Sequence, residues 1–194
     1  MFDWHMVLGI ASGAVQVYSI VPYIKGILKG ATRPSVISWS LWLVLQIIAI
    51  AGQISAGASW SLLLLLATTF NVVVILGFCL KGYGYKKYSW IDFVCLFCAI
   101  AAIFIWRITN EPTTAILMAV IADFIATIPT IIKTRKEPFS ENTFAWFLLV
   151  IAASLAAVST TKFDAANLLW PVYSILVAAL ITGLAYFGQR LKRE

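Results

Sequence analysis

Asp123 is the one acidic residue near the middle of a long apolar segment in this 194-residue chain. A charge at that depth in a membrane is costly, so such a residue usually faces a cavity or a partner and marks the path of a substrate, an ion or a proton. Burial disfavours a charged carboxylate because the charge loses its water. Asp123 is therefore predicted to bind and release a proton and to couple that proton to another step. The alternative is a neutral carboxylic acid that only bonds to a neighbouring helix.

Neutral polar residues stand at comparable depth in other apolar segments. Gln16 and Asn71 lie near the centres of theirs, and Gln46 and Tyr173 lie on further segments that can face the same path. Amide side chains in membrane helices also serve as hydrogen-bonding groups between helices, which is their structural alternative. We predict that Gln16, Gln46, Asn71, Asp123 and Tyr173 bind a small polar solute.

The chain matches itself at an offset of 107 residues. The matched pairs are Gln16 with Asp123, Pro22 with Pro129, Lys29 with Lys136, Trp39 with Trp146, and Leu41 with Leu148. Each proline follows the matched polar residue and precedes a basic loop. Proline removes a backbone donor and clashes with the preceding turn, which permits a kink. Pro22 and Pro129 are therefore predicted hinges, and the alternative is that each proline only helps to end its helix.

Long helices are needed to position these residues. The composition is 62% hydrophobic and 11% charged, which indicates an integral membrane protein. A spanning helix needs about 20 mostly apolar residues. Run lengths near this value, without period-two alternation, favour helices over strands. The sequence holds seven such runs, at 6–28, 36–56, 60–80, 90–107, 113–132, 143–160 and 168–188.

The basic residues predict the orientation of these runs. Twelve of the fourteen Lys and Arg residues lie in alternate loops and at the C-terminus, and the remaining two are Arg107 and Lys162. This bias predicts an outside N-terminus and a cytoplasmic C-terminus. Contact with anionic lipid accounts for the net charge of +6. The lipid bilayer is therefore the expected partner, and no nucleic acid is expected.

The repeat and the runs together predict an all-α membrane protein with seven transmembrane helices. Residues 1–83 are expected to form a first three-helix repeat, residues 84–111 a linker helix, and residues 112–194 a second three-helix repeat. A single linking helix makes the two triplets parallel in the membrane, which is a recognised transporter architecture.

In this layout the chain resembles the SWEET and PQ-loop superfamily of seven-helix membrane transporters. The resemblance rests on V-P-Y-I-K-G at 21–26, on I-P-T-I-I-K at 128–133 and on the order of the runs. It implies a 3+1+3 fold, an outside N-terminus and a proline at the end of the first helix of each repeat. It also implies that Asn71, in the third helix of a repeat, belongs to the pocket, and that the cargo is a sugar.

The functional prediction is a small-solute transporter that works by alternating access between the two repeats. The resemblance implies a sugar, whereas Asp123 favours an amino acid or another small metabolite moved with a proton. The alternative is a non-transporting receptor or scaffold with the same fold. We expect no enzyme, cofactor or metal, because the sequence has no metal-ligand cluster, phosphate loop or nucleophile–base pair. The expected location is the plasma membrane, and either a monomer or a homo-oligomer is compatible with the sequence.

Overall fold

The computed structural model describes residues 3–30, 34, 36–84 and 90–192. Helices make up 87% of the structure, and the described residues contain no strand. The predicted all-α class is therefore confirmed. Four of the basic residues that predict the orientation lie outside the described residues: Arg33, Lys86, Lys87 and Arg193.

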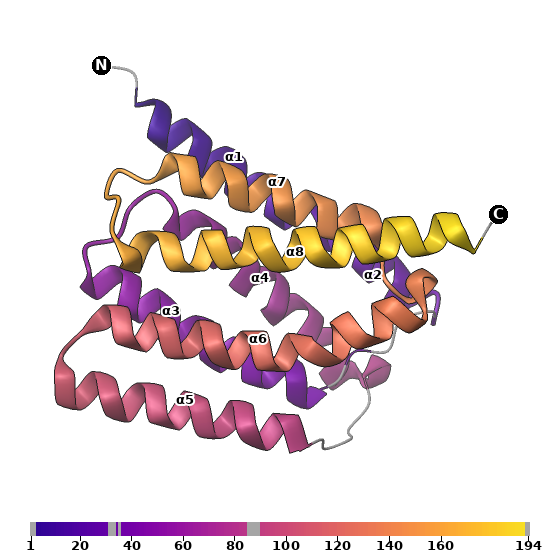
Figure 1. The fold of residues 1–194 in the computed structure, drawn as a ribbon, viewed down its shortest axis with the longest axis horizontal. Coiled ribbons are helices and arrows are strands. Elements are labelled where there is room, and N and C mark those ends of the chain that lie inside the picture. Colours follow the sequence, from indigo (N-terminus) through magenta and orange to yellow (C-terminus); the bar gives the residue numbers. More distant parts are fainter. Residues whose placement is uncertain (1–2, 31–33, 35, 85–89, 193–194) are drawn as a thin grey trace.

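The helices follow one another through short connections (Figure 1). They are α1 (Trp4–Tyr18), α2 (Ile20–Leu28), α3 (Val36–Ser55), α4 (Leu62–Phe78), α5 (Trp90–Thr109), α6 (Pro112–Lys136), α7 (Thr143–Ser159) and α8 (Ala165–Leu191). A π-helical turn, Cys79–Tyr83, follows α4, and a 3-10 turn, Pro138–Ser140, follows α6. Each predicted apolar run coincides with helical structure, and the first run is divided between α1 and α2.

Four helical segments among the described residues are long and apolar enough to cross a membrane. They are Trp4–Leu28, Leu62–Tyr83, Pro112–Lys136 and Ala165–Leu191. Shorter apolar helices occupy Trp39–Ser55, Leu96–Thr109 and Thr143–Ser159. The helices thus support a membrane protein, as the composition predicts.

The first helical segment is interrupted close to its proline. α1 ends at Tyr18 and α2 begins at Ile20. Pro22 lacks the amide hydrogen that would bond to the Tyr18 carbonyl four residues earlier, which explains an interruption at Ser19. The backbone of α6, by contrast, is helical through Pro129 as far as Lys136, and the Pro129 side chain lies outside the described part of the structure.

The helices pack side by side in one bundle (Figure 1). α4 packs against α1 and α3, and α8 packs against α6 and α7. Further contacts join α1 to α7, α3 to α6 and α5 to α6. The centre is rich in fully buried alanines of α6 and α7, namely Ala115, Ala119, Ala122, Ala152, Ala153 and Ala156. Such small residues let helices approach one another closely.

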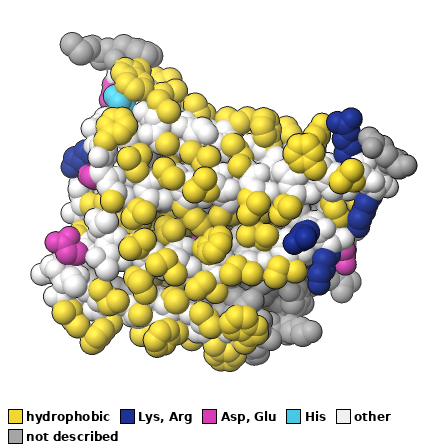
Figure 2. All heavy atoms as spheres, viewed as in Figure 1, with side chains coloured by type: hydrophobic (Ala, Val, Ile, Leu, Met, Phe, Trp, Pro, Cys, Tyr) yellow, Lys and Arg dark blue, Asp and Glu magenta, His cyan; other side chains and the backbone are white. Residues whose placement is uncertain are grey.

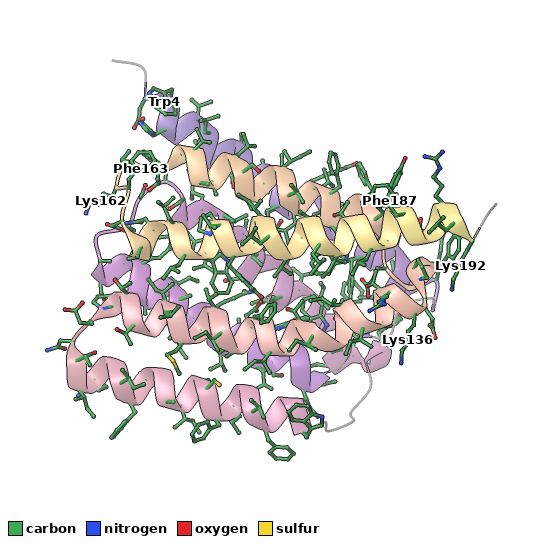
Figure 3. All side chains as sticks on the ribbon, in the orientation of Figure 1. Trp4, Lys136, Lys162, Phe163, Phe187 and Lys192 are labelled. Atoms are coloured by element: carbon green, nitrogen blue, oxygen red, sulfur yellow. The ribbon has the colours of Figure 1, made fainter. Side chains whose placement is uncertain are left out.

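The two ends of the bundle differ in charge, and a mostly hydrophobic surface separates them (Figure 2). The end that we call the basic end carries Lys136 and Lys192, close to the ends of α6 and α8 (Figure 3). Lys162 lies at the opposite end, together with Trp4 at the start of α1 (Figure 3). We call this second end the Lys162 end. The hydrophobic middle between two polar ends is the surface that a membrane-spanning bundle needs.

Candidate functional site

Asp123 and Tyr173 meet between two adjacent helices. Tyr173 on α8 donates its phenolic hydrogen to Asp123 Oδ2 on α6. Both side chains are partly buried. Trp170, one turn earlier on α8, packs edge-on against the Tyr173 ring, with the ring centroids 6.1 Å apart. The predicted carboxylate thus has a neutral partner that can orient it whether or not it carries a proton.

Gln16 and Asn71 meet in the first half of the chain. Asn71 Nδ2 on α4 donates to the backbone carbonyl of Gln16 at 2.7 Å, and it lies 3.4 Å from Ser19 Oγ. The hydroxyl of Ser19 donates to the same carbonyl, also at 2.7 Å. This carbonyl belongs to the last turn of α1, directly before the interruption. Asn71 therefore stabilises the interrupted backbone, which is the interhelical role weighed above for a membrane amide.

Gln46 lies at nearly the same depth as Asp123. α3 and α6 run in opposite directions (Figure 1), and a side chain at Gly52 would lie 2.8 Å from Ile116 Cγ1. This contact fixes the register of the two helices. Gln46 stands six residues before Gly52, which is about 9 Å along the axis. Because the two helices are antiparallel, the residue of α6 at the depth of Gln46 is about six positions after Ile116. Gln46 is therefore within about one helical turn of Asp123 in depth.

Three of the predicted residues carry amide oxygens without partners. Gln16 is 5% exposed, Asn71 6% and Gln46 3%. Gln16 Oε1, Asn71 Oδ1 and Gln46 Oε1 have no hydrogen-bond partner among the described residues. A buried polar atom left unpaired costs about 1–3 kcal/mol. These oxygens are the groups that a bound solute with hydroxyl or N–H donors would satisfy.

An apolar groove of about 650 Å³ lies elsewhere, between α7 and α8. Its lining includes Phe144, Phe147, Gly183 and Phe187, and Phe187 stands on α8 near the basic end (Figure 3). None of the five predicted binding residues lines it. Its apolar lining fits the hydrocarbon of a bilayer rather than a polar solute.

The sequence patterns did not indicate a cluster of hydrogen-bonded polar residues at the Lys162 end. Ser59 N donates to Asn167 Oδ1 at 3.0 Å, Ser61 Oγ donates to the Asn167 carbonyl at 3.2 Å, and Thr161 N donates to Ser59 Oγ at 2.7 Å. We call Ser59, Ser61, Thr161 and Asn167 the interloop cluster. It joins the loop before α4 to the loop before α8 and to the first turn of α8. The sequence feature that could have indicated the cluster is Asp164. It stands three residues before Asn167, a spacing typical of a helix N-cap.

No protein-family model, curated protein or solved structure matches this chain. The class of protein therefore follows from the geometry described above. It is an all-helical protein with helices long and apolar enough to span a membrane, and one intrahelical carboxylate is bound by a tyrosine of a neighbouring helix.

Proposed function

We propose that this chain transports a small polar solute across a membrane by alternating access between two three-helix units. The observation that carries the proposal is the Asp123 carboxylate, held by Tyr173 between two helices that are long and apolar enough to span a membrane. Acidic residues at such depth are rare, and they commonly mark substrate and proton pathways.

The packing of the helices supports two related units, residues 1–83 and 112–194, with α5 as the linker. In the first unit α4 contacts both α1 and α3, and in the second unit α8 contacts both α6 and α7. The third helix of each unit thus packs against the other two. The contacts between the units correspond as well, because α1 packs on α7 and α3 packs on α6. Parallel repeats related by an axis along the bundle are expected to have this pattern.

The proposed binding site lies between the units at the depth of Asp123. Each unit has a polar contact between its first and third helices, made by Asn71 on Gln16 and by Tyr173 on Asp123. The unpaired oxygens of Gln16, Gln46 and Asn71 accept hydrogen bonds from the solute. Asp123 binds and releases the coupled proton. A sugar, an amino acid or a similar metabolite offers the donors that such a site needs.

The helices packed against α6 bring no fixed charge to the middle of the site. α3 carries no charged residue between Val36 and Ser55. The charged residues of α5 and α8, such as Arg107 and Arg190, stand near the ends of those helices. Tyr173 is the titratable group that contacts Asp123. Proton binding at Asp123 is therefore free to respond to the solute instead of being fixed by an ion pair.

The charge asymmetry of the bundle supports an orientation. Loops rich in Lys and Arg stay on the cytoplasmic side of a membrane. On this basis the proposed orientation has the basic end in the cytoplasm and the N-terminus outside. The plasma membrane remains the expected location.

Uptake by purified protein in proteoliposomes tests the proposal. A panel of labelled sugars and amino acids is offered under an imposed proton gradient, with protein-free liposomes as the control. We expect at least one solute to accumulate, and the accumulation to collapse when a protonophore is added. Saturable binding without accumulation would favour the receptor or scaffold instead.

A further inference from the structure

One face of α3 carries three side chains that each have at least one buried polar atom without a hydrogen-bond partner among the described residues. Trp42, Gln46 and Gln53 are spaced by four and seven residues, which places them on the same face of an α-helix. The unpaired atoms are Trp42 Nε1, Gln46 Oε1, and both Nε2 and Oε1 of Gln53. We call these three residues the α3 polar face.

Gln53 is the most deeply buried residue of the α3 polar face. Its side chain is 0% exposed, yet neither of its polar atoms has a partner. Buried amides are normally hydrogen-bonded, and Asn167 shows the usual situation at the same 0% exposure. Asn167 Oδ1 accepts from Ser59 N at 3.0 Å, and Asn167 Nδ2 donates to Asp164 Oδ1 at 3.0 Å. Gln53 is therefore a fully buried amide whose polar atoms have no hydrogen-bond partner among the described residues.

Along the bundle, Gln53 lies between the depth of Asp123, where we place the proposed binding site, and the Lys162 end. Its neighbour Gly52 packs against Ile116 and the carbonyl of Pro112, at the start of α6. Gln53 follows Gln46 by seven residues, about 10 Å along the helix axis. Gln53 therefore stands at a depth that a solute would pass on its way from the proposed binding site to the Lys162 end.

We infer that Gln53 is a second solute-binding residue, used when the two units separate at the Lys162 end. This inference rests on the proposed function. Separation of the units there breaks the interloop cluster and admits water and solute to the enclosed amide. A glutamine amide offers two donor hydrogens and an acceptor oxygen, and the α3 polar face carries no charge. The ligand that fits this position is an uncharged solute with both hydrogen-bond donors and acceptors.

Cysteine labelling tests whether the position opens to water, and it requires no knowledge of the solute. In a background that lacks Cys79, Cys95 and Cys98, Gln53→Cys is compared with Leu45→Cys and Ser55→Cys. Leu45 is 0% exposed on the same helix, and Ser55 is exposed at its end. We expect a membrane-impermeant methanethiosulfonate to modify position 53 about tenfold or more faster than position 45, because only the former opens. Equal protection of positions 53 and 45 overturns the inference.

Uptake tests whether the amide itself binds the solute. Gln53→Met keeps a side chain of similar length and removes the unpaired polar atoms, so the melting temperature should stay level or rise. We expect the KM for uptake to rise about tenfold, the effect of losing one neutral hydrogen bond. Ser154→Ala is the control, because that hydroxyl bonds to the Val150 carbonyl of its own helix at 2.8 Å.

The two proposals fail in different ways. If the wild-type protein transports a solute and Gln53→Met keeps the wild-type KM, the inference about Gln53 is wrong and the proposed function stands. If the wild-type protein accumulates no solute of the panel, the proposed function fails, and the binding role of Gln53 fails with it. A raised KM together with reactive Cys at position 53 supports both.

Discussion

At the scale of residues, the buried and partly buried polar groups that have hydrogen-bond partners fall into two kinds. The hydroxyls of Thr68, Thr69 and Thr127 each bond at 2.8 Å to the carbonyl four residues earlier in their own helix. These groups are satisfied locally and need nothing from another helix or a ligand. Asp123 and Asn71, by contrast, bond to neighbouring helices. Replacement of residues of this second kind should change the site, whereas replacement of the locally bonded threonines should not.

Tyr173→Phe tests the contact that holds Asp123. The variant removes the hydroxyl donor and keeps the ring that packs on Trp170. We expect the free energy of unfolding to fall by about 0.6–2 kcal/mol, the usual range for an interhelical hydrogen bond in a membrane protein. Denaturation of the purified protein measures it. Tyr186→Phe is the matched control, an exposed tyrosine of the same helix; equal stability of the two variants would show that the contact stabilises nothing.

At the scale of elements, the apolar runs located the helices but not their ends. The run 113–132 stops four residues before α6 does, because Lys133, Arg135 and Lys136 continue the helix. Basic residues are favourable in the last turn of a helix, although they end an apolar run. Hydropathy reports what can lie in lipid, whereas caps and charges decide where a helix ends.

The sequence indicated polar residues in the middle of apolar runs, but not their hydrogen-bond partners. Depth within a run singled out Asp123 and Asn71. It did not indicate that Tyr173 would donate to Asp123, or that Asn71 would bond to a backbone carbonyl at an interrupted helix. Such pairing depends on the rotation and register of neighbouring helices, and a single sequence carries no direct record of either.

Replacing the two prolines is expected to give unequal results. Pro22→Ala restores an amide hydrogen for the Tyr18 carbonyl and should join α1 to α2. Pro129→Ala acts in α6, which is already continuous. We expect both variants to be as stable as the wild type or more stable, by up to about 3 kcal/mol, and Pro22→Ala to slow uptake more. Melting temperatures and initial uptake rates measure the two effects. Equal uptake rates in the two variants would remove the case for a hinge at Pro22.

At the scale of the whole molecule, several hydrogen bonds join residues 1–83 to residues 112–194 towards the Lys162 end. Besides the interloop cluster, Ser12 Oγ on α1 donates to the Ala152 carbonyl on α7 at 2.7 Å, and Ser12 is completely buried. In the proposed function these bonds hold the conformation closed at the Lys162 end. The units must break them in order to expose the site on that side.

Asn167→Ala tests this closure. The variant removes the acceptor for Ser59 N and leaves that buried amide hydrogen unpaired. We expect a loss of about 1–3 kcal/mol in the free energy of unfolding and faster labelling of Gln53→Cys. Ser55→Ala, at an exposed position near the same loop, should change neither quantity. Slower or unchanged labelling in the Asn167 variant would contradict the closure.

The pH dependence of uptake by Asp123→Asn tests the central claim most directly. Asparagine is nearly isosteric and keeps an oxygen that can accept from Tyr173, so the variant should fold and keep its melting temperature. It binds no proton on this side chain. We predict that proteoliposome uptake, which follows the proton gradient in the wild type, becomes independent of pH in the variant. If Asp123→Asn transports with the wild-type pH profile, Asp123 is structural and does not carry the coupled proton.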